Sequence, residues 1–208
     1  MRSLFLDLAS HGSAGLTTSA ALVACVTDQN VVSSEGVSAR ISDHELLPIT
    51  EDVLKKAGWT YKDLTHIACV IGPGGFTSLR VAVTFANILA DQLGIPLAGI
   101  HLSALYGVRV EDRVRDEMYW LHSTRKDQLF VHGGKWKEPT LVSIDEIHSQ
   151  FLILNSQFSW AGELIPEHRA KIDADPVALK TIDDILPGFL AAQTYRKESL
   201  HPWYGRGW

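Results

Sequence analysis

The sequence predicts an α/β fold with two lobes, of which the second is smaller and less regular. Three short apolar runs separated by polar turns open the chain, and they predict an antiparallel meander over residues 3–36. A helix, a strand, a second helix and a further strand follow, with the spacing of parallel strands joined by a right-handed crossover. We expect the first lobe at 1–105 and the second at 106–208, with the boundary near 101–115.

The strands expected in the first lobe are short and mostly apolar. A small, polar stretch at 9–20 separates the first two strands and suits a hairpin tip. The expected strands lie at 3–9, 20–26, 31–36, 66–71 and 96–100.

The first expected helix covers 43–57. Ser42 and Asp43 are candidate N-caps, and Glu45 completes a capping box with Ser42. Pro48 lies inside the helix and removes a backbone donor, so we expect a first turn that is kinked or not yet α-helical. Gly58 ends the helix, whose apolar stripe consists of Leu46, Ile49, Val53, Leu54 and Ala57.

The loop Gly72-Pro73-Gly74-Gly75 joins a strand to the second expected helix at 77–93. A glycine-rich turn of this kind can bind phosphate on backbone N–H groups. The loop lacks the lysine of a P-loop and the glycine register of a dinucleotide site. We favour a structural role, in which Gly74 and Gly75 adopt turn conformations closed to other residues and Thr77 caps the helix.

The second helix is apolar on more than one side. Val81, Phe85 and Ile88 lie off its main stripe, and a helix that is apolar on two sides needs a second partner. A protein interface and deep burial within the chain remain equal alternatives. The candidate interface residues on the two helices are Leu46, Leu47, Leu54, Phe76, Leu79, Arg80 and Val83.

The second half of the chain is less regular. The segments 117–122 and 127–134 predict paired strands, and 143–150 predicts a short helix. Two more strands are expected at 151–155 and 158–164. The stretch 109–117 predicts a solvated helix, and 175–195 is helical in two halves separated by Pro187-Gly188.

Composition excludes several classes of function. The net charge is −5, which argues against tight nucleic-acid binding by this chain alone. No two of the nine histidines are three to five residues apart, which excludes a helix-borne pair of metal ligands, and we expect no metal site. Cys25 and Cys69 lie in apolar runs and predict buried thiols, so we expect no catalytic nucleophile. No signal peptide or membrane span is visible, and we expect a soluble cytoplasmic protein.

Asp7 is the acid that ends the first strand, next to the 9–20 stretch. A carboxylate there could handle a metal-bound phosphate, or could be satisfied by backbone donors of the adjacent loop. The residue alone does not decide between the two.

Several motifs resemble the TsaB (YeaZ) family, the dimerisation subunit of the bacterial machinery that makes N6-threonylcarbamoyladenosine (t6A) in tRNA. That family has a strand ending in Asp-Thr-Ser, a His-Ser-x-x-Leu-Leu-Pro helix and a Gly-Pro-Gly-Ser-Phe-Thr-Gly-Leu-Arg turn. The matching segments here are 7–10, 42–48 and 72–80. The second half is similar more loosely, through 123–130 and the C-terminal Pro202, Tyr204 and Arg206, with Ser123 in place of the family's aspartate.

The resemblance implies the fold of actin, Hsp70 and sugar kinases (ASKHA, ribonuclease H-like) with a reduced second lobe. It implies a non-catalytic subunit that binds a TsaD-like catalytic subunit through helices of the first lobe, forms a homodimer in its absence, works with a TsaE-like ATPase and meets tRNA only indirectly. It implies no cofactor or metal in this chain alone, with room for a nucleotide shared with the partner. Asp7 and Ser10 would be remnants of a nucleotide site. The rival hypothesis is a nucleotide-dependent kinase-like enzyme that uses Asp7 and the 9–20 hairpin.

Overall fold

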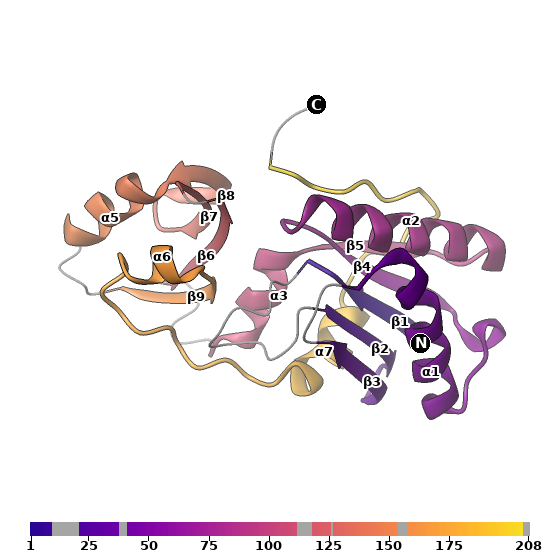
Figure 1. The fold of residues 1–208 in the computed structure, drawn as a ribbon. Coiled ribbons are helices and arrows are strands. Elements are labelled where there is room, and N and C mark those ends of the chain that lie inside the picture. The colour runs from indigo at the N-terminus through magenta and orange to yellow at the C-terminus, as the bar shows by residue number, and fades with distance from the viewer. Residues whose placement is uncertain (10–20, 38–40, 112–117, 126, 154–157, 206–208) are drawn as a thin grey trace. The chain divides into compact units, whose positions relative to one another are not determined.

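The computed structural model describes residues 1–9, 21–37, 41–111, 118–125, 127–153 and 158–205, and these residues divide into two compact units (Figure 1). Unit 1 contains the described residues up to Leu102 together with Thr181–Tyr204, and unit 2 contains those of Ser103–Lys180 and Gly205. The change of unit after Leu102 falls within the expected boundary region.

The expected assignment of all residues after 105 to the second lobe differs from this division, because Thr181–Tyr204 return to unit 1. The helix α7 (Ile182–Ala191) packs beside β2 and β3 of that unit. Its amphipathic pattern indicates that one face is buried, but it does not indicate which unit buries it.

Unit 1 is built on a mixed five-stranded sheet of order β3-β2-β1-β4-β5 (Figure 1). β1 pairs antiparallel with β2 and β2 with β3, whereas β1 pairs parallel with β4 and β4 with β5. The expected meander and parallel crossover are both present. The strands are β1 (Arg2–Asp7), β2 (Ala21–Thr27), β3 (Val31–Val37), β4 (His66–Gly72) and β5 (Leu97–His101).

The helix α1 (Asp43–Ala57) has the predicted bounds and caps. The Glu45 carboxylate accepts the backbone N–H of Ser42 at 2.9 Å, and Gly58 ends the helix with a φ of 70°. The alternative of a first turn that is not yet α-helical is wrong, because the helix runs from Asp43 through Pro48. Pro48 lies on the exposed side of α1, where the missing backbone donor costs little.

The helix α2 (Phe76–Leu93) begins at Phe76 and not at Thr77 as expected, and its N-cap is Gly75 instead of Thr77. The glycine roles also differ from the expectation. Gly72 has a φ of +143°, while Gly74 is required for close packing, since a Cβ there would lie 2.7 Å from the Ala9 Cα. A Cβ on Gly75 would meet nothing closer than the Ser78 Oγ at 3.5 Å.

Unit 2 contains a four-stranded sheet of order β8-β7-β6-β9. The expected pairing of the segments near 117–134 is confirmed by antiparallel β6 and β7. The strand expected at 151–155 is wrong for the part that is described, because α5 runs to Ile153. The elements are α3 (Leu102–Arg109), β6 (Met118–Arg125), β7 (Gln128–Gly133), β8 (Trp136–Ser143), α5 (Ile144–Ile153), β9 (Ser159–Glu163) and α6 (Pro166–Arg169).

Two further expectations concern helices late in the chain. The 109–117 helix lies mostly outside the described residues. The stretch 175–195 is not helical in two halves: residues 175–180 are outside any helix, and α7 continues through Pro187 and Gly188. Pro187 is buried in α7, so packing of this helix outweighs the lost backbone hydrogen bond.

The loop before α2 leads to a stability prediction that compares two neighbouring glycines. We expect Gly74→Ser to destabilise the chain by about 2 kcal/mol, because its Cβ would overlap Ala9, and to lower the melting temperature by roughly 4–8 °C. We expect Gly75→Ser to change the stability by less than about 0.5 kcal/mol, because space is open there and serine is a favourable N-cap. Thermal unfolding followed by circular dichroism measures both, and equal effects would contradict the packing role of Gly74.

Candidate functional site

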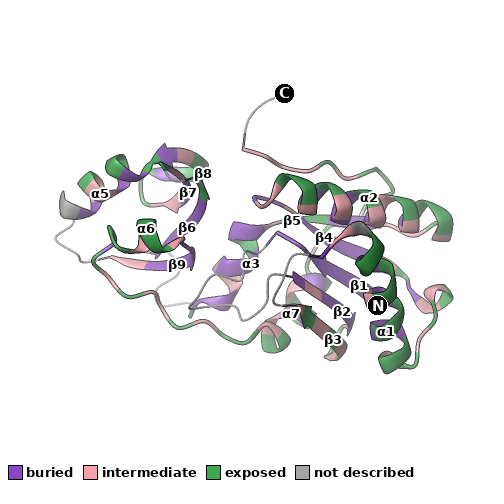
Figure 2. Ribbon diagram, viewed as in Figure 1, coloured by how far each residue is buried: buried purple, intermediate pink, exposed green. Residues whose placement is uncertain are grey.

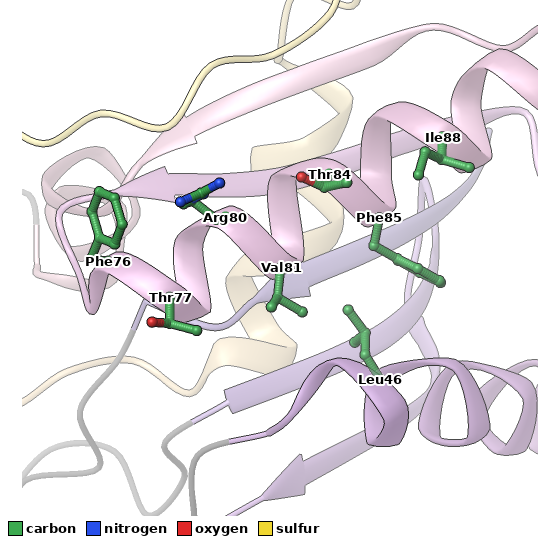
Figure 3. A pocket seen from close by; sticks show the side chains of 8 residues that line it. All are labelled: Leu46, Phe76, Thr77, Arg80, Val81, Thr84, Phe85 and Ile88. Carbon is green, nitrogen blue, oxygen red and sulfur yellow. The ribbon is translucent and has the colours of Figure 1, made fainter.

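A groove on the surface of unit 1 lies between α1 and α2 (Figure 3). Its volume is about 470 Å³, and its exposed lining is more apolar than polar. Seven of its lining residues come from α2 and one from α1: Leu46, Phe76, Thr77, Arg80, Val81, Thr84, Phe85 and Ile88.

The helical period explains why these α2 side chains share one face. Thr77, Val81, Thr84 and Ile88 follow one another at intervals of three or four residues, which is the spacing of neighbours on a helix surface. The core stripe of α2 lies beside them and is buried: Leu79, Ala82, Val83, Ala86 and Ala90. The side of α2 toward the sheet is therefore buried, whereas its outer side is largely exposed (Figure 2).

The apolar side chains of the groove face are unusually exposed for their size. Phe76 is 59% exposed and Ile88 is 60% exposed, while Val81 and Phe85 are half-buried. On α1, Leu47 is 48% exposed. Large apolar side chains gathered at one groove are typical of binding surfaces. The expectation that α2 is apolar on two sides agrees with this arrangement.

The structure separates the expected interface residues into two groups. Leu54, Leu79 and Val83 are at most 3% exposed and belong to the core, so they are not available to a partner on the surface of unit 1. Leu46 is also fully buried, although it is the residue of α1 that lines the groove. The accessible members are Leu47, Phe76 and Arg80.

Sequence reasoning assigned Thr77 to a cap and did not select Thr84 at all. The structure places both on the rim of the groove. The same i, i+3 and i+4 spacing that connects Val81 to Ile88 passes through Thr84, so helical periodicity could have identified it.

Arg80 is the basic side chain of the groove. Its guanidinium carbon lies 5.3 Å from the centre of the Phe76 ring, a cation–π geometry. Arg80 is exposed and makes no ion pair with any residue that the structure describes. The groove therefore combines apolar surface with a positive charge that a partner's carboxylate could meet.

The strand β1 places Asp7 at its end, where the side chain is 5% exposed. Its Oδ1 accepts the backbone N–H of Ala9 at 2.8 Å. This contact matches the backbone-donor alternative for a buried carboxylate. Ser10 and the other residues of the expected hairpin tip, up to residue 20, lie outside the described residues. Among the described residues, no group of three or more His, Cys, Asp or Glu is arranged to hold a metal ion.

The loop from Gly72 to Gly75 is packed against its surroundings at two points. The carbonyl oxygen of Trp203 lies 2.2 Å from the position of a Cβ on Gly72, and Ala9 occupies the corresponding place at Gly74. Glycines at these two positions are accounted for by close backbone approach. The structural role favoured for the loop is consistent with this packing.

Unit 2 contains several buried polar side chains, of which Ser123 belongs to the loosely matching segment 123–130. The Tyr106 hydroxyl donates to Glu163 at 2.8 Å, and Ser123 hydrogen-bonds the His168 Nδ1 at 2.8 Å. The Ser123 Oγ also accepts the N–H of Ile165 at 3.0 Å. A serine beside a histidine could suggest a nucleophile and its base, but Ser123 and His168 are at most 2% exposed. The pair is placed to hold β6 against the segment after β9.

The cysteines are buried as expected. Cys25 and Cys69 are fully inaccessible. Burial raises the pKa of Cys25 to about 11, against a smaller opposite effect of a hydrogen bond with Ser33. Burial and, less strongly, the nearby Asp7 carboxylate raise the pKa of Cys69. Both groups are thiols at neutral pH and are poor nucleophiles.

The mixed sheet of unit 1, with an antiparallel meander continued by a parallel crossover, defines the class of protein: the ribonuclease H-like fold of actin, Hsp70 and the sugar kinases. The model of the family TsaD, tRNA N6-adenosine threonylcarbamoyltransferase, matches residues 29–147.

Relatives similar over most of the chain carry another name. The tRNA threonylcarbamoyladenosine biosynthesis protein TsaB of Escherichia coli (strain K12) is 23% identical over 99% of this chain and 95% of its own. The protein of the same name from Buchnera aphidicola subsp. Schizaphis graminum is 24% identical over 75% of this chain and 80% of its own.

Solved structures agree on the fold. A Pseudomonas aeruginosa protein described as uncharacterized, with similarity to peptidase YEAZ, covers 99% of both chains with a TM-score of 0.68 and 18% identity. YeaZ from the same organism covers 68% of this chain and 64% of its own, with a TM-score of 0.51 and 23% identity. The chain belongs to the TsaD family of tRNA N6-adenosine threonylcarbamoyltransferase, and it is similar over most of its length to proteins named TsaB.

No helix among the described residues is long and apolar enough to cross a lipid bilayer.

The buried thiols lead to a prediction about reactivity and pH. We expect neither cysteine to react with Ellman's reagent in the folded chain at pH 8, and both to react after denaturation. Because the folded pKa of Cys25 is raised from 9.0 to about 11, the folded state prefers the protonated thiol, so stability should fall as the pH rises through 9 toward 11. Cys25→Ala should weaken this pH dependence. Rapid labelling of the folded chain would contradict the assignment of both residues to the core.

Proposed function

We propose that this chain is a non-catalytic subunit of the machinery that makes t6A in tRNA, and that it binds and activates a TsaD-like catalytic subunit through the α1/α2 groove. The observation that carries the proposal is the exposed apolar face of α2 beside Arg80, on a chain of the TsaB family. Membership in this family supports the t6A pathway, and the groove supports the mode of binding.

The side chains of the groove suit binding better than chemistry. They are aliphatic and aromatic groups, two threonines and one arginine, and the described residues that line the groove include no carboxylate, histidine or cysteine that could act as a general base or nucleophile. The proposed role is therefore to hold the catalytic partner in an active arrangement.

The partner should present a complementary surface. An apolar helix ridge would fill the groove between Leu46 and Ile88, and a carboxylate at the rim would pair with Arg80. A stable interface of standard size buries about 1,600 Å² in total, so it would extend beyond the groove onto the exposed side of α1, where Leu47 lies.

The proposal includes the wider assembly. Without the catalytic subunit, a second copy of the chain would cover the same face. A TsaE-like ATPase and the tRNA would be bound mainly by the other subunits, in keeping with the net charge of −5. We place this assembly in the cytoplasm, and a nucleotide, if one is needed, at the junction with the partner.

Replacing Ile88 by aspartate tests the groove. We expect Ile88→Asp to weaken binding of the TsaD-like subunit from the same organism by at least about 100-fold, because it buries an unpaired charge within the contact. Val32→Asp is the matched control, because Val32 is 39% exposed on β3 and does not line the groove. Isothermal titration calorimetry measures the affinity, and light scattering after size exclusion measures dimer formation.

The two variants give a clear comparison. Both positions are exposed, so we expect unchanged melting temperatures, which would show that both variants fold. If Ile88→Asp binds the partner and dimerises as the unmodified chain does, the assignment of this face is wrong. Loss of binding in Val32→Asp as well would indicate a different or more extended interface.

The second candidate function is a nucleotide-dependent kinase-like enzyme. The observation that favours it is the position of Asp7, a buried carboxylate at the end of β1 in a fold shared with sugar kinases. Its Oδ1 already accepts the Ala9 N–H, which favours the structural role instead.

Calorimetry with ATP and magnesium separates the two functions. We expect no micromolar binding to the isolated chain. Binding that is lost in Asp7→Asn and kept in Asp52→Asn, a variant of an exposed acid on α1, would favour the enzyme. Melting temperatures of both variants show whether a loss of binding reflects a loss of fold.

A further inference from the structure

The last described residues of unit 1 run alongside its sheet after α7 ends. We call residues 195–204 the C-terminal segment. Arg196 pairs with Leu97 on the edge strand β5 through two backbone hydrogen bonds, of 2.7 and 2.8 Å. The Asn87 side chain on α2 donates to the Leu200 carbonyl at 3.0 Å and accepts the Leu200 N–H at 2.8 Å. The segment is thus attached to both β5 and α2.

Further along, Trp203 attaches the segment to the end of β4. Its N–H donates to the Ile71 carbonyl at 2.7 Å, and its ring meets His101 edge-on with ring centres 4.4 Å apart. Gly72 lies next to the Trp203 backbone, and any Cβ on this glycine would overlap the Trp203 carbonyl. The absence of a side chain at this glycine leaves room for the segment.

The segment then reaches the first turn of α2. The ring of Tyr204 stacks on Phe76, with centres 5.0 Å apart and planes 30° from parallel. Arg80 also lies over the Phe76 ring, at 5.3 Å. Phe76 is therefore held by one neighbour from α2 and one from the C-terminal segment, yet it remains 59% exposed where the groove begins.

We propose that Tyr204 is a positioning residue for partner binding, which orders the Phe76 side chain at the end of the groove. This inference rests on the proposed docking function. An exposed phenylalanine samples several rotamers, and a partner must immobilise it at an entropic cost. Stacking against Tyr204 restricts those rotamers before the partner arrives. The C-terminal segment thereby becomes part of the docking surface, although it is more than 100 residues from α2 in sequence.

The experiment is a double-mutant cycle on the full chain, with affinity for the TsaD-like subunit measured by calorimetry. We expect Tyr204→Ala to weaken binding roughly 3- to 10-fold, in the range of aromatic pair energies. Tyr204→Phe should bind as tightly as the unmodified chain, because the ring makes the stacking contact. In a Phe76→Ala background, Tyr204→Ala should have little further effect. Tyr195→Ala is the control, because Tyr195 belongs to the same segment but packs on His66.

Each outcome has one meaning. If Tyr204→Ala leaves the affinity unchanged while Ile88→Asp abolishes binding, the positioning role is wrong and the docking groove stands. If Ile88→Asp does not weaken binding, the proposed docking function of the groove is wrong, and the positioning role that rests on it is wrong as well. Equal losses in Tyr195→Ala and Tyr204→Ala, or additive effects of Tyr204→Ala and Phe76→Ala, would mean that the segment supports only the fold. Melting temperatures of all variants identify any that unfold.

Discussion

Close packing of the glycine loop between β4 and α2 is the constraint on which the rest of unit 1 depends. A side chain at Gly74 would overlap Ala9, just after β1, and a side chain at Gly72 would overlap Trp203 of the C-terminal segment. The start of α2 is thereby fixed against two other parts of the chain. With that start fixed, the register of α2 decides which side chains enter the core and which line the groove.

The helix α2 is apolar on two sides, and it contributes one side to the core and the other to the proposed binding surface. Its buried stripe, from Leu79 to Ala90, contributes to the core that supports the sheet. Its second stripe leaves Phe76 and Ile88 exposed, although burying them elsewhere would be favourable. An exposed apolar stripe on a well-packed helix is explained most simply by a partner, and Arg80 at its edge adds a basis for selecting that partner.

Much of unit 1 was predictable because its signals are local. Short apolar runs between polar turns predicted the strands, and the Ser42–Glu45 capping box together with Gly58 predicted the bounds of α1. The exposure of the interface candidates was not predictable in the same way. Leu47 and Leu79 look alike in sequence, yet one is 48% exposed and the other is fully buried. Hydrophobic periodicity identifies stripes on a helix, but it does not say which stripe meets the sheet.

The sequence by itself determined the element types of unit 1, the class of fold and, through its motifs, the family to which the chain belongs. Tertiary structure alone decided that Thr181–Tyr204 return to unit 1, that Gly74 is needed for packing, and that Tyr204 lies on Phe76. These contacts join residues far apart in the chain. Their formation depends on the summed packing of whole elements, which no local pattern of residues encodes.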